Sequence, residues 1–387
     1  MKIIRRAFAF LLFLFLFAAL LPAQTAEKTT NTKRNYLAFV GTYTTKTASK
    51  GIYAFRYDAN SGKLTPIGVA AETPDPSWVG IHPNGKFLYA ANEAGKNSMV
   101  SAFAIDSQSG KLTLLNQVSA LAEDPCYLSF DRSGKYVFVA NYTSGNVVVF
   151  PVGADGKLGA ATANIRDEGK VGPNKERQDG PHAHWVQASS DNRFVFVADL
   201  GLDGILVYLF NSAKGTLTPN KLPFRPLAAG AGPRHAAFSP DGHFYVLNEI
   251  DSTIETFAYA REHGIFGYLG VVPMLPAGFK GRNDAAEIAI DSSGKFLYGS
   301  NRGHDSIVVF RIDATTGRLT AAGDFSVQGK EPRNFVIDPT GAFLLAADQL
   351  SDKIVTFRID QKTGALTPTG DSADVPSPVC IAFWPIE

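Results

Sequence analysis

The sequence predicts an all-β protein, a single seven-bladed β-propeller, and three observations carry this prediction. A short turn of the Gly-Lys-Leu-Thr type recurs seven times, for example at Gly62 and at Gly317. An apolar and aromatic run that ends in Asn or Asp recurs about every 50 residues, a period typical of propeller blades. After the first 23 residues, no stretch shows a sustained helical period. The repeats are therefore expected to consist of strands.

Each repeat contains four predicted antiparallel strands, A to D, of which strand A is the innermost. Strand A begins after a proline such as Pro233, and strand B is the aromatic run, as at 87–92. Strand C is a Val-Val-Phe-type run, as at 307–310, and strand D follows the Gly-Lys-Leu-Thr turn. β-branched and aromatic runs bounded by Gly, Asn and Asp are typical of strands. Four-stranded blades of this kind, arranged around a channel, form a propeller with short, protected edges.

The two ends of the repeat region predict how the ring closes. The region begins with a strand B over 36–40 and ends with a lone strand A over 378–383. We expect these strands to complete one blade together, because termini in separate blades would leave two unpaired sheet edges. A single domain is thus predicted over 36–387. The alternative interpretation of the periodicity is two separate β-sandwiches.

The N-terminus has the pattern of a targeting segment. Lys2, Arg5 and Arg6 precede an unbroken apolar run over 7–21, and small residues follow it. This order predicts a secretory signal peptide over 1–23 and a periplasmic or secreted protein, with no membrane attachment after cleavage. An uncleaved anchor is the alternative, although the run is shorter than the roughly 20 residues that a membrane span needs. The polar stretch 24–35 is predicted to be a disordered lead-in.

Composition and motifs exclude several classes of function. A formal net charge of +1 with 19% charged residues argues against a nucleic-acid partner. The chain has no Gly-x-Ser-x-Gly, His-Glu-x-x-His or Cys-x-x-Cys motif, so neither a cofactor nor a metal is predicted. His182 and His184 could form a metal pair, but a third ligand is not evident. Cys126 and Cys380 are expected to be free thiols, because a whole blade separates them.

Topology, in contrast, predicts where functional side chains would gather. The start of strand A and the end of strand B lie at the same end of every blade, so these positions share the mouth of the central channel. The second positions of strand A are occupied by Ser77, Cys126, His184, Arg234, Ala286, Arg333 and Val379. The positions directly after strand B are occupied by Glu93, Tyr142, Leu200, Glu249, Arg302 and Gln349.

Ionisable residues dominate these positions in three consecutive repeats, whereas the other repeats, including that of Glu93, carry mostly bland residues. We expect the ionisable set to converge on the mouth, together with His184 from the preceding repeat. Arginines can hold a carboxylate or a phosphate with paired hydrogen bonds, and a glutamate and a histidine can share acid and base roles. The predicted ligand is therefore a small anionic molecule. The alternative is that the arginines only pair with glutamates and fill space.

Two groups of residues are expected to stay out of the mouth. Glu287 and Asn334 are one step out of phase on strand A and are expected to face the sheet. His235, His243 and His304 are expected to be surface or turn residues.

Several local motifs resemble the seven-bladed propeller lactonase family, which includes a bacterial 6-phosphogluconolactonase and a fungal carboxy-cis,cis-muconate cyclase. The resemblance covers about residues 36–387. The stretches that carry it are Val40-Gly41-Thr42-Tyr43, Asp179-Gly180-Pro181-His182-Ala183-His184, Asp199-Leu200-Gly201-Leu202-Asp203, Gly232-Pro233-Arg234-His235, Asn248-Glu249 and Asn301-Arg302-Gly303.

The resemblance implies an active site of one histidine, two arginines and one glutamate. These fall on His184, Arg234, Glu249 and Arg302, four residues that the topological argument also selects. His182, Arg333 and Gln349 are predicted to contribute to substrate binding.

The predicted function is a lactone hydrolase of the 6-phosphogluconolactonase type, acting as a monomer on an anionic sugar-type lactone. A muconate-type cycloisomerase or lyase acting on an unsaturated dicarboxylate is one alternative, and a non-catalytic ligand-binding propeller is another. The sequence leaves open whether His184 or Glu249 is the base.

Overall fold

The computed structural model describes residues 35–386, in which strands form almost all of the regular structure. The predicted signal peptide lies outside the described residues. The same holds for the predicted lead-in, apart from Asn35, where the first strand begins. Within residues 35–386, no helix is both long and apolar enough to cross a membrane.

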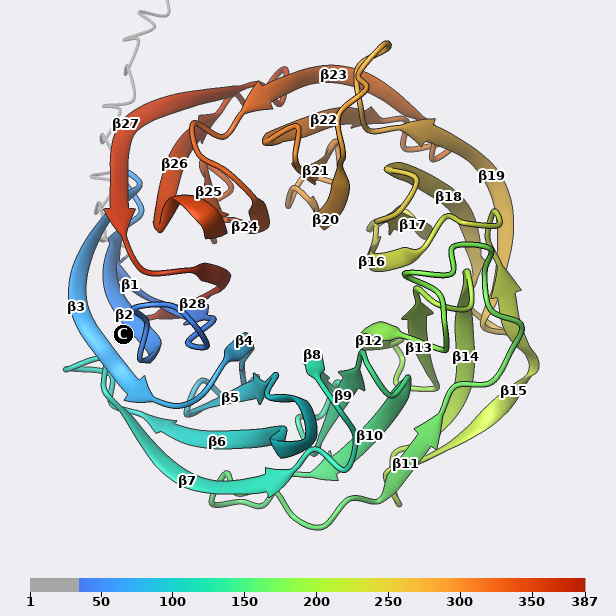
Figure 1. The fold of residues 1–387 in the computed structure, drawn as a ribbon, viewed down its shortest axis with the longest axis horizontal. Coiled ribbons are helices and arrows are strands. Elements are labelled where there is room, and N and C mark those ends of the chain that lie inside the picture. Colours follow the sequence, from blue (N-terminus) through green and yellow to red (C-terminus); the bar gives the residue numbers. More distant parts are fainter. Residues whose placement is uncertain (1–34, 387) are drawn as a thin grey trace, which may run out of the picture. The chain divides into compact units, whose positions relative to one another are not determined.

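Seven four-stranded antiparallel sheets surround a common axis, as predicted (Figure 1). The blades, each given from the axis outward, are β28 (Pro378–Pro385), β1 (Asn35–Thr42), β2 (Gly51–Asp58), β3 (Lys63–Glu72); β4 (Pro76–Ile81), β5 (Phe87–Asn92), β6 (Met99–Ile105), β7 (Leu112–Ser119); β8 (Pro125–Phe130), β9 (Tyr136–Asn141), β10 (Asn146–Pro151), β11 (Ala163–Arg166); β12 (Ala183–Ala188), β13 (Phe194–Asp199), β14 (Gly204–Asn211), β15 (Thr216–Pro226); β16 (Pro233–Phe238), β17 (His243–Asn248), β18 (Thr253–Ala260), β19 (Ile265–Pro273); β20 (Asp284–Ile290), β21 (Phe296–Arg302), β22 (Ser306–Ile312), β23 (Leu319–Ser326); and β24 (Pro332–Ile337), β25 (Phe343–Asp348), β26 (Lys353–Ile359), β27 (Leu366–Asp374). Two short 3-10 helices, Gly95–Asn97 and Gln349–Ser351, follow β5 and β25.

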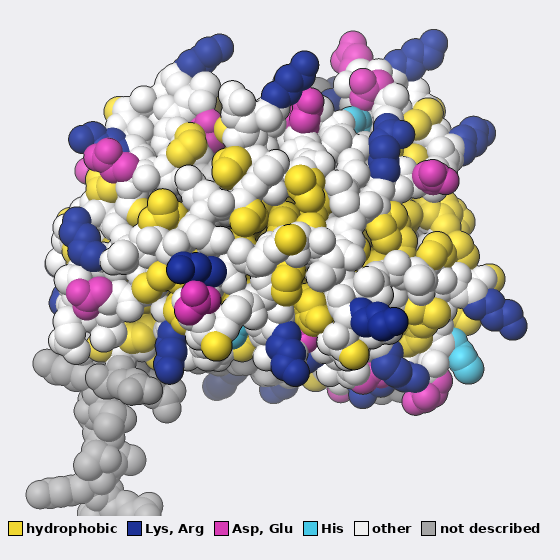
Figure 2. Space-filling view, turned by 90° about the horizontal axis from the view of Figure 1, so that it is seen from below, with side chains coloured by type: hydrophobic (Ala, Val, Ile, Leu, Met, Phe, Trp, Pro, Cys, Tyr) yellow, Lys and Arg dark blue, Asp and Glu magenta, His cyan; other side chains and the backbone are white. Residues whose placement is uncertain are grey.

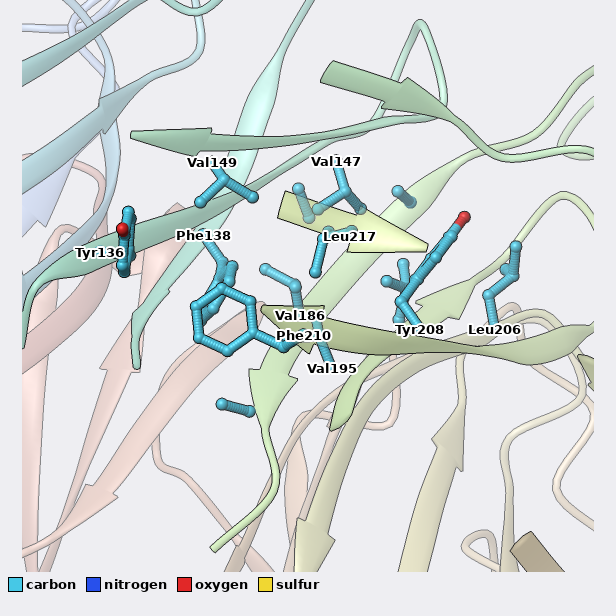
Figure 3. Close-up of a cluster of buried hydrophobic side chains, with 14 of the residues drawn as sticks. Tyr136, Phe138, Val147, Val149, Val186, Val195, Leu206, Tyr208, Phe210 and Leu217 are labelled. Carbon is cyan, nitrogen blue, oxygen red and sulfur yellow. The ribbon is translucent and has the colours of Figure 1, made fainter. Parts of the chain in front are cut away.

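The middle strands are buried on both faces, because each sheet packs between two neighbouring blades. Every residue of β9 is buried, whereas only one residue of the outermost strand β7, Leu112, is buried. Between the third and fourth blades, Phe138 and Val149 pack with Val195 and Tyr208 (Figure 3). Burying an apolar side chain of this size contributes roughly 1.5–3 kcal/mol, so the interfaces between blades supply the main stabilisation of the ring.

The two ends of the described chain close the ring, as predicted. Strand β1 pairs antiparallel with β28, with Ala38 opposite Phe383 and Val40 opposite Ile381 (Figure 1). β28 therefore occupies the innermost place in a blade whose other three strands come from the beginning of the propeller.

A break in pairing register occurs near the start of each innermost strand. In β16, for example, Pro233 pairs with Asn248 but His235 pairs with Leu247, so that Arg234 is an extra residue. Such a β-bulge kinks the strand and re-aims its side chains. In β20 the break spans two residues, Ala286 and Glu287. The bulges thus lie at the second position of strand A, from which the predicted site residues come.

Candidate active site at the channel mouth

A cavity of about 340 Å³ opens at the mouth of the channel, and every blade contributes to its lining. Most of its lining residues are polar or charged, unlike the apolar layers between blades. They are Tyr43, Glu93, Cys126, Tyr142, Arg177, His184, Glu249, Arg282, Asp284, Arg302 and Arg333.

A larger cavity, of about 680 Å³, lies on the outer rim between the fourth and fifth blades. Its lining includes exposed apolar side chains such as Leu209 and Leu222. Apolar side chains lie among charged ones on the outer side of the ring that Figure 2 shows. Because no buried ionisable groups converge on the rim cavity, the mouth is the better candidate for chemistry.

Glu249 is the centre of a charge cluster at the mouth. Its Oε2 lies 2.9 Å from Arg234 Nε and 3.0 Å from Arg302 Nη2, and its Oε1 pairs with Arg177. Burial alone would raise the pKa of Glu249, but the positive charges of Arg302, Arg234 and Arg177 outweigh burial and lower this pKa to about 2. The carboxylate therefore stays charged and is a weak base at neutral pH.

His184 has the opposite character. The residue is buried, and its Nδ1 has no hydrogen-bond partner. Burial, followed by the nearby charge of Arg234, lowers the pKa of His184 well below its ordinary value. The imidazole is consequently neutral at physiological pH, so an unprotonated ring nitrogen is present to accept a proton, although the lowered pKa makes His184 a weaker base than a free histidine.

On the other side of the mouth, Tyr43 and Glu93 form a pair. The Tyr43 hydroxyl donates a hydrogen bond of 2.7 Å to Glu93 Oε2, and the Arg333 guanidinium lies 5.2 Å from the centre of the Tyr43 ring. Burial outweighs the charge of Arg333 and raises the pKa of Glu93. Glu93 thus lines the mouth although the rest of its repeat is bland, and its hydrogen-bond partner Tyr43 comes from another blade.

Comparison with known proteins identifies the family. The family model described as "Lactonase, 7-bladed beta-propeller" matches residues 37–383. The chain belongs to this family. A Bacillus subtilis protein named 6-phosphogluconolactonase is 37% identical over 349 residues, which are 90% of this chain and 98% of that protein. A Formosa agariphila protein of the same name is 35% identical over 306 residues, which are 77% and 85% of the two chains.

A solved structure of the Pseudomonas aeruginosa periplasmic gluconolactonase is also similar, with a TM-score of 0.86 and 34% sequence identity. The match covers 91% of this chain and all of that one. The sequence prediction of a lactone hydrolase is thus confirmed at the level of the family.

Two predicted substrate-binding residues of this lactonase do not line the mouth cavity. The ring nitrogens of His182 lie 2.9 Å from the Tyr142 carbonyl oxygen and 2.9 Å from Asp179 Oδ1, and the ring stacks on Tyr142. His182 thus ties together two loops. Gln349 begins a 3-10 helix, and its backbone N–H donates to the Glu331 carbonyl. Arg333, the third predicted binding residue, does line the cavity.

Arg177 was not predicted, because it comes from the irregular loop between β11 and β12. It pairs with Glu249, and its Nη1 lies 3.3 Å from Asp284 Oδ1. The next residue, Gln178, anchors the loop by donating hydrogen bonds to the Leu200 carbonyl and to Asp203. The only motif that the sequence shows in this loop is Asp179-Gly180-Pro181 at its end, and this motif does not indicate that an arginine enters the site.

A second layer of polar residues lies beneath the mouth, where the sequence predicted surface or sheet-facing side chains. His235 is 1% exposed, and its Nδ1 lies 3.0 Å from Glu287 Oε1. Its Nε2 lies 3.2 Å from Arg234 Nη1, and since a guanidinium only donates, Nε2 is the acceptor. Glu287 Oε2 accepts a hydrogen bond from Asn334.

The expectations for His235, Glu287 and Asn334 are therefore wrong. Each residue lies directly after or within a bulge, and the bulges turn these side chains away from the orientation that simple strand alternation gives.

Proposed function

We propose that this lactonase-family protein hydrolyses a sugar-type lactone that carries an anionic group. The observation that carries the proposal is the neutral imidazole of His184, whose Nδ1 has no hydrogen-bond partner, in a cavity that four arginines line. The relatives named 6-phosphogluconolactonase and gluconolactonase support a sugar lactone as the substrate class. Nothing comparable favours the muconate-type or the non-catalytic alternative.

His184 is the proposed general base. It would take a proton from a water molecule as that water attacks the lactone carbonyl, a role that typically contributes 10²–10⁴-fold in rate. Glu249 suits this role less well, because three arginines stabilise its charged form and a bound proton would disrupt those ion pairs. In this assignment Glu249 instead holds the arginines in place.

Arg302 and Arg177 are the proposed groups that stabilise the oxyanion of the tetrahedral intermediate. Arg302 is fixed by Glu249 and by its Nε, which donates to the Asp284 carbonyl at 3.1 Å. Arg177 is fixed by Glu249 and the Asp284 carboxylate. Fixed positive charges that meet a developing negative charge are a major source of catalysis, since they need little reorganisation during the reaction.

The anionic group of the substrate is proposed to bind near the remaining arginines of the lining. Arg333 lies on the Tyr43 side of the cavity, whereas the Arg282 side chain is 87% exposed at the entrance. Four arginines face three carboxyl groups in the lining, namely Glu93, Glu249 and Asp284. This surplus of positive charge favours an anionic ligand.

We also propose that the protein acts in the periplasm or is secreted. The apolar N-terminal run of the sequence supports this proposal, as does the relative whose name places it in the periplasm. A periplasmic site of action would favour unphosphorylated aldonolactones. The test substrates below therefore include both kinds of lactone.

The testing experiment measures acid release in a pH-stat with gluconolactone and with 6-phosphogluconolactone, after subtraction of spontaneous hydrolysis. We expect enzymatic turnover of at least one of them and a loss of about 10²–10⁴-fold in kcat for His184→Asn. The matched control is His263→Asn, because His263 is exposed and lines only the rim cavity. No turnover by the folded protein on either lactone, or full activity of His184→Asn, would contradict the proposal.

A further inference from the structure

The mouth contains two glutamates whose surroundings differ. Glu249 in the fifth blade touches three arginines, as described above. Glu93 in the second blade is partly buried and accepts a hydrogen bond from a neutral group, the Tyr43 hydroxyl. Two carboxyl groups that share a cavity and have contrasting environments commonly take different roles in acid–base chemistry.

Glu93 and His184 line the mouth from blades that are separated only by the third blade, so one bound substrate can lie between them. Cys126, in the third blade, lies in the cavity lining between the blade of Glu93 and the blade of His184. Its Sγ lies 3.7 Å from the His184 carbonyl oxygen. The thiol itself is unsuited to proton transfer at neutral pH, because burial raises its pKa far above the ordinary value. A ligand over Cys126 would therefore be flanked by Glu93 and His184.

We infer that Glu93, oriented by Tyr43, is the general acid that protonates the leaving ring oxygen of the lactone. The inference rests on the proposed lactone hydrolase function and adds to it, because a water-activating base alone does not account for the departure of an alkoxide. An alkoxide is a poor leaving group in water, so its protonation as the bond breaks lowers the barrier.

The proton balance of the reaction closes within these groups. The water oxygen forms a bond to the carbonyl carbon while His184 takes one water proton. The tetrahedral intermediate then collapses, the bond from carbon to the ring oxygen breaks, and Glu93 gives its proton to that oxygen. The new carboxylic acid loses a proton to solvent, and the proton on His184 returns to Glu93 through water. One water is consumed and one proton is released overall.

The surroundings of Glu93 decide its pH response. Tyr43 and Cys126 face it from the first and third blades, Arg333 faces it from the seventh, and Asp124 acts from the loop before β8. Burial and Asp124 favour the neutral acid, whereas Arg333 and the Tyr43 hydrogen bond favour the carboxylate. Loss of the Tyr43 hydroxyl would therefore raise the pKa of Glu93.

The test compares Glu93→Gln, Tyr43→Phe and wild type in kcat, KM, pH–rate profile and melting temperature. We expect Glu93→Gln to lose about 10²-fold or more in kcat, with KM changed less than about threefold, and to lose the alkaline limb of the profile. Tyr43→Phe should lose less activity and should move that limb to higher pH. Glu72→Gln makes the same chemical change on a side chain that is 73% exposed, and it should leave the activity unchanged.

The outcomes separate the two proposals. An active wild type with an unchanged pH profile in folded Glu93→Gln would overturn the role of Glu93 and leave the hydrolase assignment intact. The same holds if that variant only lowers the melting temperature and keeps its kcat. A wild type that turns over no lactone would overturn both. Normal activity of Tyr43→Phe with an unshifted limb would remove Tyr43 from the inference.

Discussion

Glu249 and Asp348 are two buried acids that lie at successive positions of the repeat, one in the fifth blade and the other in the seventh. They differ in how readily they ionise. Glu249, directly after β17, has three arginine partners and a pKa of about 2. Asp348, the last residue of β25, is fully buried, and neither of its carboxylate oxygens has a hydrogen-bond partner. Burial raises the pKa of Asp348 to about 8. Burial thus opposes ionisation in both cases, and only the partners decide which form is present.

The comparison also distinguishes a residue of the site from a residue that only occupies a repeated strand position. Asn occupies the place of Asp348 in four of the other blades, where its amide can donate. Asn92, for example, donates to Thr73 Oγ1 at 2.9 Å and to the Pro74 carbonyl at 2.5 Å. A charged Asp cannot make such bonds. Asp348 therefore occupies a structural position at a cost in stability, whereas Glu249 is embedded in a site.

The largest effect is expected when the charge of Glu249 is removed. Glu249→Gln leaves Arg177, Arg234 and Arg302 without a counter-charge, and breaking a buried ion pair typically costs about 3–5 kcal/mol. We expect a lower melting temperature and a loss of about 10²-fold or more in kcat/KM, because the arginines lose their fixed positions. Denaturation and pH-stat kinetics measure the two effects.

The pH dependence of the Glu249 effect has a definite sign. The folded pKa lies below the unfolded one, so the stabilisation is fully present above about pH 4.5 and is lost as the pH falls toward 2. The stability difference between wild type and Glu249→Gln should therefore shrink over that range. A difference that grows with falling pH would contradict the charge cluster.

A smaller effect is expected one layer down, at His235. His235→Phe removes the acceptor that meets Arg234 Nη1, so Arg234 should be less well oriented toward Glu249. We expect a loss of about tenfold in kcat/KM and partial recovery in His235→Gln, whose amide oxygen can accept. Equal losses in the two variants would indicate a packing role instead.

The smallest effect is expected at Asp348, and its direction is opposite. Asp348→Asn should raise the melting temperature and leave kcat unchanged, because the amide needs no proton to stay neutral. The folded pKa of about 8 lies above the unfolded one, so wild type loses stability as the pH rises from about 4 through 8. The gain in Asp348→Asn should be larger at pH 8 than at pH 5.

Asn92→Asp is the reciprocal change and provides the control for Asp348. It should destabilise the protein, and more so at high pH, because the new carboxylate faces the Pro74 carbonyl. A stabilising effect of Asn92→Asp would show that these positions are not equivalent.

The sequence predicts the blades and the site to different extents. Short repeating strands depend on local patterns, so the seven blades and the pairing of β1 with β28 follow from the sequence. Strand direction also brings His184, Glu249 and Arg302 to the lining of one mouth, and Arg234 contacts Glu249 from a buried position beside it. Each of these four residues lies at a strand position that topology fixes.

The remaining site residues depend on contacts that no local pattern records. Arg177 enters from a loop without repeat symmetry, and its reach depends on the folded path of that loop. A role for Glu93 becomes visible only in the folded protein, because its hydrogen-bond partner Tyr43 lies in another blade. His235 and Glu287 were misplaced, because a bulge of one or two residues changes which side of the strand a residue faces.

The pairing of β1 with β28 has a consequence for how the chain acquires its structure. Each other blade is built from residues close together in sequence, so these sheets can form while the chain is still being made. The first blade lacks its innermost strand until β28 has been synthesised, and contacts between such distant segments form slowly. Until then the chain is an open arc with two unprotected edges, which makes this the stage at which chaperones or proteases would most readily engage it.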